Sequence, residues 1–253
     1  MRALAALLVI LIDGAAVSRA AAMTPTELAD FDVKADYAFY TEDGRALERL
    51  VAGGQGLAAS ARPIERYQYA HAQLRVLQVA LRQRRPKTAE AAANVCIEVL
   101  ERANDDDPGF AEGHILEGTC AGYLSAFGGL RGLAAARRSE SRLAAAKAVA
   151  PANPRLLLAT ALTRWYRSEA ADGDRRIARE AFEHAAAAFD AVVGEPTPGD
   201  PSWGAAEAWL FVGIDLEESD DYIGARNAYE KSLLIAPEFA AARRRLAALA
   251  ARP

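Results

Sequence analysis

The sequence predicts an all-α protein, a solenoid in which helices pack as consecutive pairs. One observation is compositional: alanine, leucine, arginine and glutamate, which favour helix, dominate the chain, whereas aromatic residues make up only 8% and long β-branched runs are few. The other is that one pattern of small and large residues recurs along the chain at a fixed spacing. Such recurrence is typical of stacked helix pairs.

The clearest helix pair lies within residues 209–237. A short acidic turn separates its two helices, and each helix carries one row of inward-facing residues at helical spacing. These rows are Trp209, Val212, Gly213 and Leu216 in the first helix, and Ala225, Tyr229 and Ser232 in the second, with Pro237 after it. Gly213 and Ala225 are small where the two helices must cross closely, and Tyr229 is large enough to fill the remaining gap.

Residues 1–22 have the features of a secretory signal peptide. Arg2 provides a positive charge, residues 3–12 form an apolar stretch too short to span a bilayer, and Ala20 and Ala22 form a small-residue cleavage site. The sequence therefore predicts an exported, periplasmic protein with no membrane span after cleavage. The alternative is a frayed amphipathic N-terminus.

Residues 23–60 are predicted to form an N-terminal helical extension. Thr24 and Pro25 are typical of a helix start, so residues 23–43 are expected to hold one short helix or a half-ordered arm. A single helix is predicted for residues 43–59, and glycines weaken its end.

The repeat domain is predicted for residues 61–253. Its expected helices cover 63–83, 87–104, 111–123, a segment that ends at Pro151, 154–168, 174–193 and the pair described above. Residues 124–133 and 168–174 are insertions, and 194–203 form a Pro/Gly linker. Residues 238–251 are predicted as a closing helix with Arg243, Arg244 and Arg245 on a solvated outer face, as the cap of a solenoid requires.

The spacing of 4, 3 and 5 residues between the second-helix positions resembles that of a tetratricopeptide repeat (TPR), which implies a right-handed solenoid of about four helix pairs. Cys96, Leu100, Ala103 and Pro108 show the same spacing as the C-terminal pair. Residues 90–245, with the run NPRLLLATALTRWYR and Pro201-Ser202-Trp203-Gly204, look like a family of uncharacterised bacterial envelope TPR proteins. They are more distantly similar to the TPR-type accessory component of tripartite periplasmic transporters.

No set of residues in the sequence predicts catalysis, a metal or a cofactor. His71, His114 and His184 fall on three different predicted helices, and each has at most one acidic neighbour at helical spacing, which is fewer than a zinc site needs. They are expected on helix surfaces or partly buried. The formal charge of −4 also argues against nucleic acid as the main partner.

Cys96 and Cys120 are the two cysteines of the chain, and the repeat register places them on neighbouring helices. Export would allow a disulfide between them. Two small buried thiols are the equal alternative.

The predicted binding surface is the concave groove lined by the first helix of each pair. Seven residues are expected on its inward side: Tyr123, Leu158, Leu162, Trp165, Tyr166, Leu210 and Ile214. Because an exposed apolar surface of this size normally binds something, the sequence predicts a non-catalytic scaffold for a protein or peptide partner. The resemblance to the transporter component implies an alternative, an apolar small molecule. In a third possibility, the insertions or the N-terminal arm fill the groove and make it core.

Overall fold

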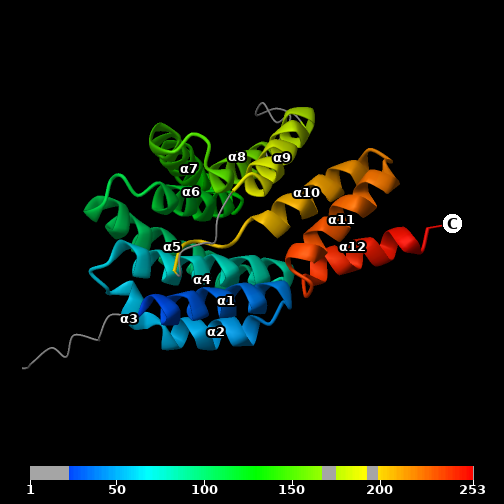
Figure 1. Ribbon diagram of the computed structural model, residues 1–253. Coiled ribbons are helices and arrows are strands. Elements are labelled where there is room, and N and C mark those ends of the chain that lie inside the picture. Colours follow the sequence, from blue (N-terminus) through cyan, green and yellow to red (C-terminus); the bar gives the residue numbers. More distant parts are fainter. Residues whose placement is uncertain (1–22, 167–174, 193–198, 253) are drawn as a thin grey trace, which may run out of the picture.

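The structure confirms the all-α fold. The computed structural model describes residues 23–166, 175–192 and 199–252, and within these ranges it contains helices and connecting loops without strands (Figure 1). No helix in these ranges is long and apolar enough to cross a membrane. The predicted signal peptide lies outside them. The helices are α1 (Pro25–Tyr40), α2 (Gly44–Gly53), α3 (Gln55–Ala58), α4 (Pro63–Arg82), α5 (Pro86–Asp106), α6 (Ala111–Ser125), α7 (Gly129–Val149), α8 (Pro154–Tyr166), α9 (Arg175–Asp190), α10 (Ala205–Glu218), α11 (Tyr222–Ile235) and α12 (Ala240–Ala250).

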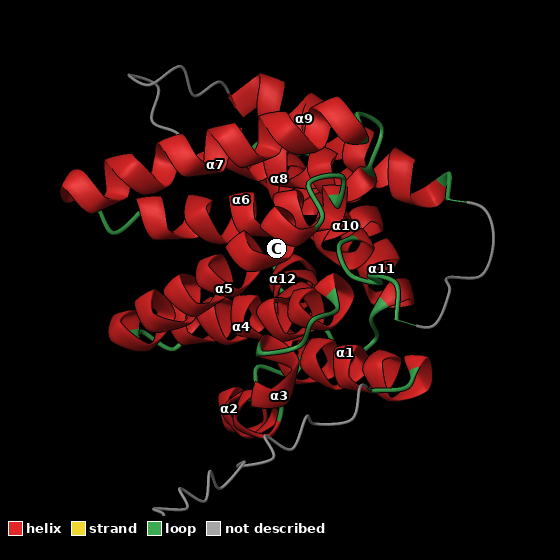
Figure 2. Ribbon diagram, turned by 90° about the vertical axis from the view of Figure 1, so that its left-hand side faces the viewer, coloured by secondary structure: helices red, strands yellow, loops and turns green. Residues whose placement is uncertain are grey.

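Four consecutive helix pairs make up the repeats, as predicted. The pairs are α4/α5, α6/α7, α8/α9 and α10/α11, and α12 packs on α11 as a closing helix. Neighbouring pairs contact each other mainly where α5 meets α6 and where α9 meets α10. In addition α4 touches α6 and α6 touches α8, so these first helices follow one another along the inner side of the stack. Figure 2 shows the pairs arranged in an arc, with α12 returning towards its start.

The small residues of the first helices lie where the repeat register places them. A Cβ atom added to Gly213 would come within 2.4 Å of the Tyr229 ring, and one added to Gly118 would come within 2.9 Å of Leu143. Tyr229 and Leu143 hold the same position in their second helices. Two repeats therefore use the same close crossing between a glycine and a large side chain.

The N-terminal extension is more ordered than the sequence predicts. Residues 25–40 form a complete helix, because Thr24 and Glu27 cap its start reciprocally. The predicted single helix over residues 43–59 is wrong: it divides into α2 and α3 at Gly54. A Cβ atom at Gly54 would lie 2.7 Å from the Phe31 ring, so α1 packs closely against the break.

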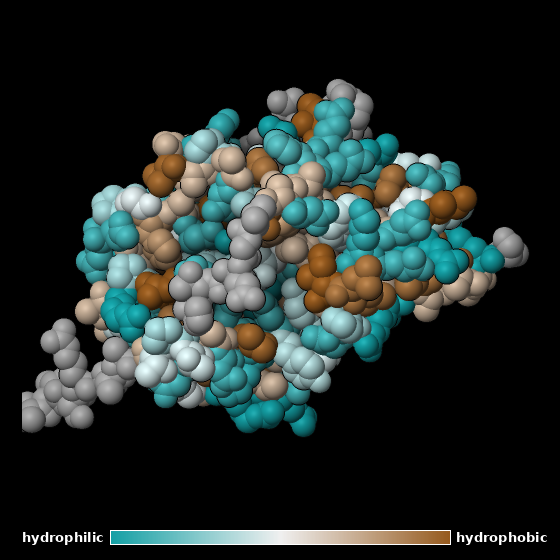
Figure 3. All heavy atoms as spheres, viewed as in Figure 1, coloured by the Kyte–Doolittle hydropathy of each residue, from teal (hydrophilic) through white to brown (hydrophobic). Residues whose placement is uncertain are grey.

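The insertion at residues 124–133 lengthens helices instead of covering the groove. A short turn joins α6 to α7, with φ angles of +77° at Gly128 and +64° at Gly129, which suit glycine. Leu130 and Leu133 at the start of α7 are exposed. On the face seen in Figure 3, apolar side chains gather where α11 meets α12. The other insertion, 168–174, lies outside the described residues.

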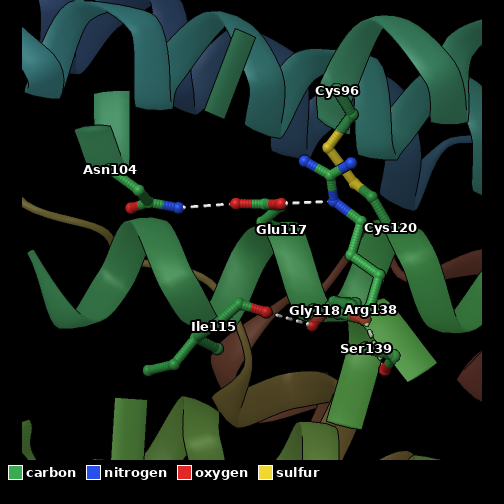
Figure 4. The surroundings of a disulfide bond; sticks show 9 residues. Cys96, Asn104, Ile115, Glu117, Gly118, Cys120, Arg138 and Ser139 are labelled. Atoms are coloured by element: carbon green, nitrogen blue, oxygen red, sulfur yellow. Dashed lines mark hydrogen bonds and ion pairs between the residues drawn. A yellow bond between two sulfur atoms is a disulfide. The ribbon is translucent and has the colours of Figure 1, made fainter. Parts of the chain in front are cut away.

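Cys96 and Cys120 are joined in a disulfide that links α5 to α6, with 6.4 Å between their Cα atoms (Figure 4). Close by, the buried Glu117 carboxylate accepts hydrogen bonds from Asn104 Nδ2 (2.7 Å) and Arg138 Nε (2.6 Å). Since these donors lie on α5 and α7, a covalent bond and a buried ionic contact together fix the first two helix pairs.

Gly213→Ala is expected to lower the free energy of unfolding by about 1–3 kcal/mol, because the added methyl group overpacks the crossing against Tyr229. Urea unfolding followed by circular dichroism measures it. Gly53→Ala is the matched control: its Cβ would meet nothing within 4 Å, and it should be neutral or stabilising. Equal effects of the two substitutions would contradict the assigned crossing.

Cys96→Ala/Cys120→Ala is expected to lower stability by about 3 kcal/mol, because the disulfide closes a loop of 24 residues in the unfolded chain. Thermal melts with and without reductant measure this loss. A reductant should destabilise the native protein and leave the double variant unchanged, whereas a native melt that is insensitive to reductant under unfolding conditions would exclude the bond.

Candidate functional site

The candidate site is a pocket of about 520 Å³ on the concave side of the helix stack. The inner helices α4, α6, α8 and α10 supply most of its lining, and residues of α1, α12 and the segment before α10 complete it. A volume of this order is typical of sites for small molecules.

Six of the seven predicted groove residues line this pocket: Tyr123, Leu158, Leu162, Tyr166, Leu210 and Ile214. Trp165 does not line it. Its side chain is buried against Phe182 of α9, with 5.7 Å between the ring centroids. Trp165 lies beside the inward-facing row of α8, on the side of the helix that faces α9. There its large ring fills the space between the two paired helices.

Sequence reasoning missed the residues contributed by the two ends of the chain. Phe39 of α1 and Arg82 of α4 line the pocket, as do Arg244 and Arg245 of α12. The two α12 arginines were expected on a solvated outer face. Their side chains are exposed, as expected, but they lie at the rim of the pocket and not on the outer side, because α12 folds back across the mouth of the arc. The spacing of residues within a single helix does not predict this closure.

The contact between the two ends closes one side of the pocket. Phe239, at the start of α12, packs on Phe39 and Tyr40 with centroid separations of 5.7 and 4.8 Å. Beside them, Arg244 forms a two-pronged ion pair with Glu42, in the turn after α1, at 2.6 and 2.9 Å. The N-terminal extension is therefore a wall of the pocket.

A buried ionic cluster lies beneath the pocket floor. The Arg75 guanidinium of α4 is fully buried and contacts Asp36 of α1 and Glu207 of α10, each at 2.6 Å. The Tyr40 hydroxyl donates to Glu207 at 3.1 Å, and Arg75 lies 4.0 Å from the centroid of the Phe39 ring. This cluster joins α1, α4 and α10.

His71 is fully buried, contrary to the expectation of a surface or partly buried position. Its Nδ1 lies 2.7 Å from Asp32 Oδ1, and its ring stacks on Trp203 at 5.4 Å. Ser202 Oγ donates to the other Asp32 oxygen at 2.9 Å, and Trp203 Nε1 donates to Tyr67 at 2.8 Å. The Ser202-Trp203 segment, noted in the sequence, is thus anchored on α1 and α4.

Asp32, Asp36 and His71 each offer a ligand atom within 4.8 Å of the others, which is the geometry of a potential metal site. The Arg75 guanidinium already contacts Asp36, and a second positive charge beside it would be repelled. The donor set therefore fits an internal ion network better than a cation.

Burial raises the pKa of Asp36 to about 6, against the opposing attraction of Arg75 and His71. Burial also acts to raise the pKa of Asp32 and of Glu207. However, His71 holds the pKa of Asp32 below its usual range, and Arg75 does the same for Glu207. Because one guanidinium serves both Asp36 and Glu207, one of the two carboxyls takes up a proton more readily.

The free energy of unfolding is expected to carry a pH-dependent contribution from Asp36. Its folded-state pKa of about 6 exceeds the ordinary value of 3.8, so this contribution is full below pH 3.8 and is lost as the pH rises through 6. At about 1.4 kcal/mol per pKa unit, the stability of the native protein relative to Asp36→Asn should fall by about 2 kcal/mol between pH 4 and 7. Urea titrations of both proteins at several pH values test this. A difference that is constant or grows with pH would contradict it.

Comparison with known proteins supports the fold alone. No protein-family model matches the chain, and no curated protein matches it. Among solved structures, TTC0263, a thermophilic TPR protein of Thermus thermophilus, is 18% identical with a TM-score of 0.53 over 90% of this chain and 99% of that one. The HusA haemophore from Porphyromonas gingivalis is 20% identical with a TM-score of 0.58 over 76% of this chain and 92% of its own. The protein thus has a TPR-like helical fold, similar in structure to TPR proteins.

Proposed function

We propose that this protein is a non-catalytic binding protein whose concave pocket holds a small molecule with a large apolar part. The observation that carries the proposal is the apolar wall formed by α8 and α10. Its side chains are Leu158, Leu162, Leu210, Phe211 and Ile214, which line one pocket of about 520 Å³. Apolar side chains that line a concave space gain free energy when a ligand displaces water from them.

The closed side of the pocket favours a small molecule over an extended peptide. A peptide in a TPR groove runs along several inner helices, whereas here the contacts of Phe239 with Phe39 and of Arg244 with Glu42 bound the space at one end. A protein or peptide partner is the second candidate. In its favour, Tyr166 is 68% exposed and lines the same pocket, so a partner's side chain could enter beside it.

A non-catalytic role agrees with the side chains that face the pocket. Among the described lining residues, Glu207 is the one carboxylate, and it is held by Arg75 and Tyr40. The His71–Asp32 pair, which has the chemistry for proton transfer, is buried and does not line the pocket. TPR-like repeat folds are also usually scaffolds.

Export to the periplasm is part of the proposal. The signal-like residues 1–22 are its basis, and the Cys96–Cys120 disulfide supports it, because such bonds persist in oxidising compartments.

Native and denaturing mass spectrometry of the protein purified from the periplasm tests both parts. The expected result is a chain cleaved after Ala22 that carries a small molecule lost on denaturation. If the purified protein carries no ligand, it is then titrated with apolar probes. Haem is included because one protein of similar fold is described as a haemophore. A mature protein that binds no probe but cross-links to a periplasmic protein would replace the small molecule with the peptide or protein partner.

Ile214→Asp is expected to weaken ligand binding at least tenfold, because a bound apolar group would leave the new carboxylate poorly solvated. Leu234→Asp is the matched control, since Leu234 lies on α11 at 82% exposure and does not line the pocket. Isothermal titration of both variants with the recovered ligand measures the effect. Equal affinity in the two would place the ligand elsewhere.

A further inference from the structure

The pocket has two chemically different sides. The wall from α8 and α10 is apolar, whereas α4 and α12 contribute three arginines, Arg82, Arg244 and Arg245. A wholly apolar ligand would leave these guanidinium groups facing a dry surface, at a cost in desolvation. The three arginines therefore indicate that the ligand has a polar or charged group in addition to its apolar part.

The arginines around the pocket outnumber the carboxylates that pair with them. Glu42 accepts both Arg82 and Arg244, and Glu217 accepts both Arg245 and Arg252. The three arginines that line the pocket thus share two carboxylates, one of which also pairs with Arg252, and this leaves an excess of positive charge. On the floor the balance is reversed, because Arg75 serves both Asp36 and Glu207. The potential therefore favours an anion beside α4 and α12 and disfavours one at the floor.

Arg82 is only weakly neutralised by its carboxylate partner. Arg244 holds Glu42 at 2.6 and 2.9 Å, and Arg82 reaches the same carboxylate at 3.3 Å. The Arg82 side chain is 31% exposed and lies over the Phe39 ring, 4.5 Å from its centroid. Burial lowers the pKa of Arg82, although an arginine remains charged at neutral pH. An anion from a ligand would compensate this burial.

Tyr123 offers a further donor on the same side. Its hydroxyl oxygen accepts a hydrogen bond from Gln78 Nε2 at 3.1 Å, and Arg75 donates to the side-chain oxygen of the same residue, Gln78 Oε1. Among the described residues, no acceptor is paired with the Tyr123 hydroxyl hydrogen, and Tyr123 and Arg82 both line the pocket. A charged and a neutral donor from adjacent helices are thus available to one ligand group.

We propose that the ligand is an amphipathic anion, with its apolar part against α8 and α10 and its single anionic group at Arg82 and Tyr123, beside Arg244. This inference rests on the proposed small-molecule function and defines the class of ligand. The shared chemistry is an anionic oxygen group on an apolar body, which a free carboxylic acid or a phosphate ester can supply.

Titration of the purified protein with dodecanoate, dodecyl phosphate and dodecanol tests the proposal. At least one anion should bind roughly tenfold or more tightly than the alcohol, as expected for a hydrogen bond to a charged group. The preference between dodecanoate and dodecyl phosphate identifies whether the anionic group is a carboxylate or a phosphate ester. Added salt should reduce the affinity for the anion and not that for the alcohol.

Substitutions locate the anionic group. Arg82→Met should reduce anion affinity roughly tenfold and leave dodecanol binding unchanged, and Arg82→Lys should retain part of the preference. Tyr123→Phe keeps the ring and removes only the donor, so it should cause a smaller loss. Arg226→Met is the matched control, because Arg226 pairs with Glu230 on the surface of α11 and does not line the pocket.

The outcomes separate this inference from the proposed function. Equal affinity for the anions and dodecanol, unaffected by Arg82→Met, would overturn the amphipathic anion and leave the apolar pocket in place. If none of the three probes binds and the mature protein carries no small molecule, the proposed function itself fails, and this inference with it.

Discussion

The buried Arg75 guanidinium is the interaction on which the shape of this protein depends. It lies on the first helix of the first repeat and contacts a carboxylate from the N-terminal extension, Asp36, and one from the last repeat, Glu207. Helix pairs that contact only their neighbours would form an open arc. Here one charge joins elements more than 100 residues apart in the sequence, and removal of a single partner would leave a buried charge uncompensated. The ion cluster therefore fixes the curvature that makes the concave side a pocket.

The segment before α10 adds a second connection between the ends of the chain. Trp203 packs on His71 and donates to Tyr67, and Ser202 donates to Asp32. Since these partners lie on α1 and α4, residues 199–204 pass over the N-terminal extension and the first repeat before α10 begins. The extension is consequently part of the repeat core. A boundary near residue 60 can be drawn in the sequence pattern, but the helices on its two sides pack together.

Local spacing was sufficient to predict the helix pairs and the part of the pocket that they line. Leu158, Leu162 and Tyr166 follow one stripe of α8, and Gly118 and Gly213 mark the close crossings, so a helical period alone places them. It could not place Phe39, Arg82 or Arg244. Their position depends on the closure of the arc by Arg75 and by the contact of Phe239 with Phe39, and closure is a long-range property. The buried state of His71 was missed for the same reason, because its partner Asp32 lies 39 residues away.

The ion cluster and the pocket share residues, and this links stability to binding. Phe39 lines the pocket while the guanidinium groups of Arg75 and Arg82 lie over its ring, and Glu207 reaches the pocket from the cluster. A floor held by charge-assisted hydrogen bonds has few alternative conformations, so little conformational entropy is lost when a ligand binds. An apolar floor could be equally or more stable, because buried ions are costly to desolvate. The charged cluster is thus better explained by the fixed geometry it gives the pocket than by its contribution to stability.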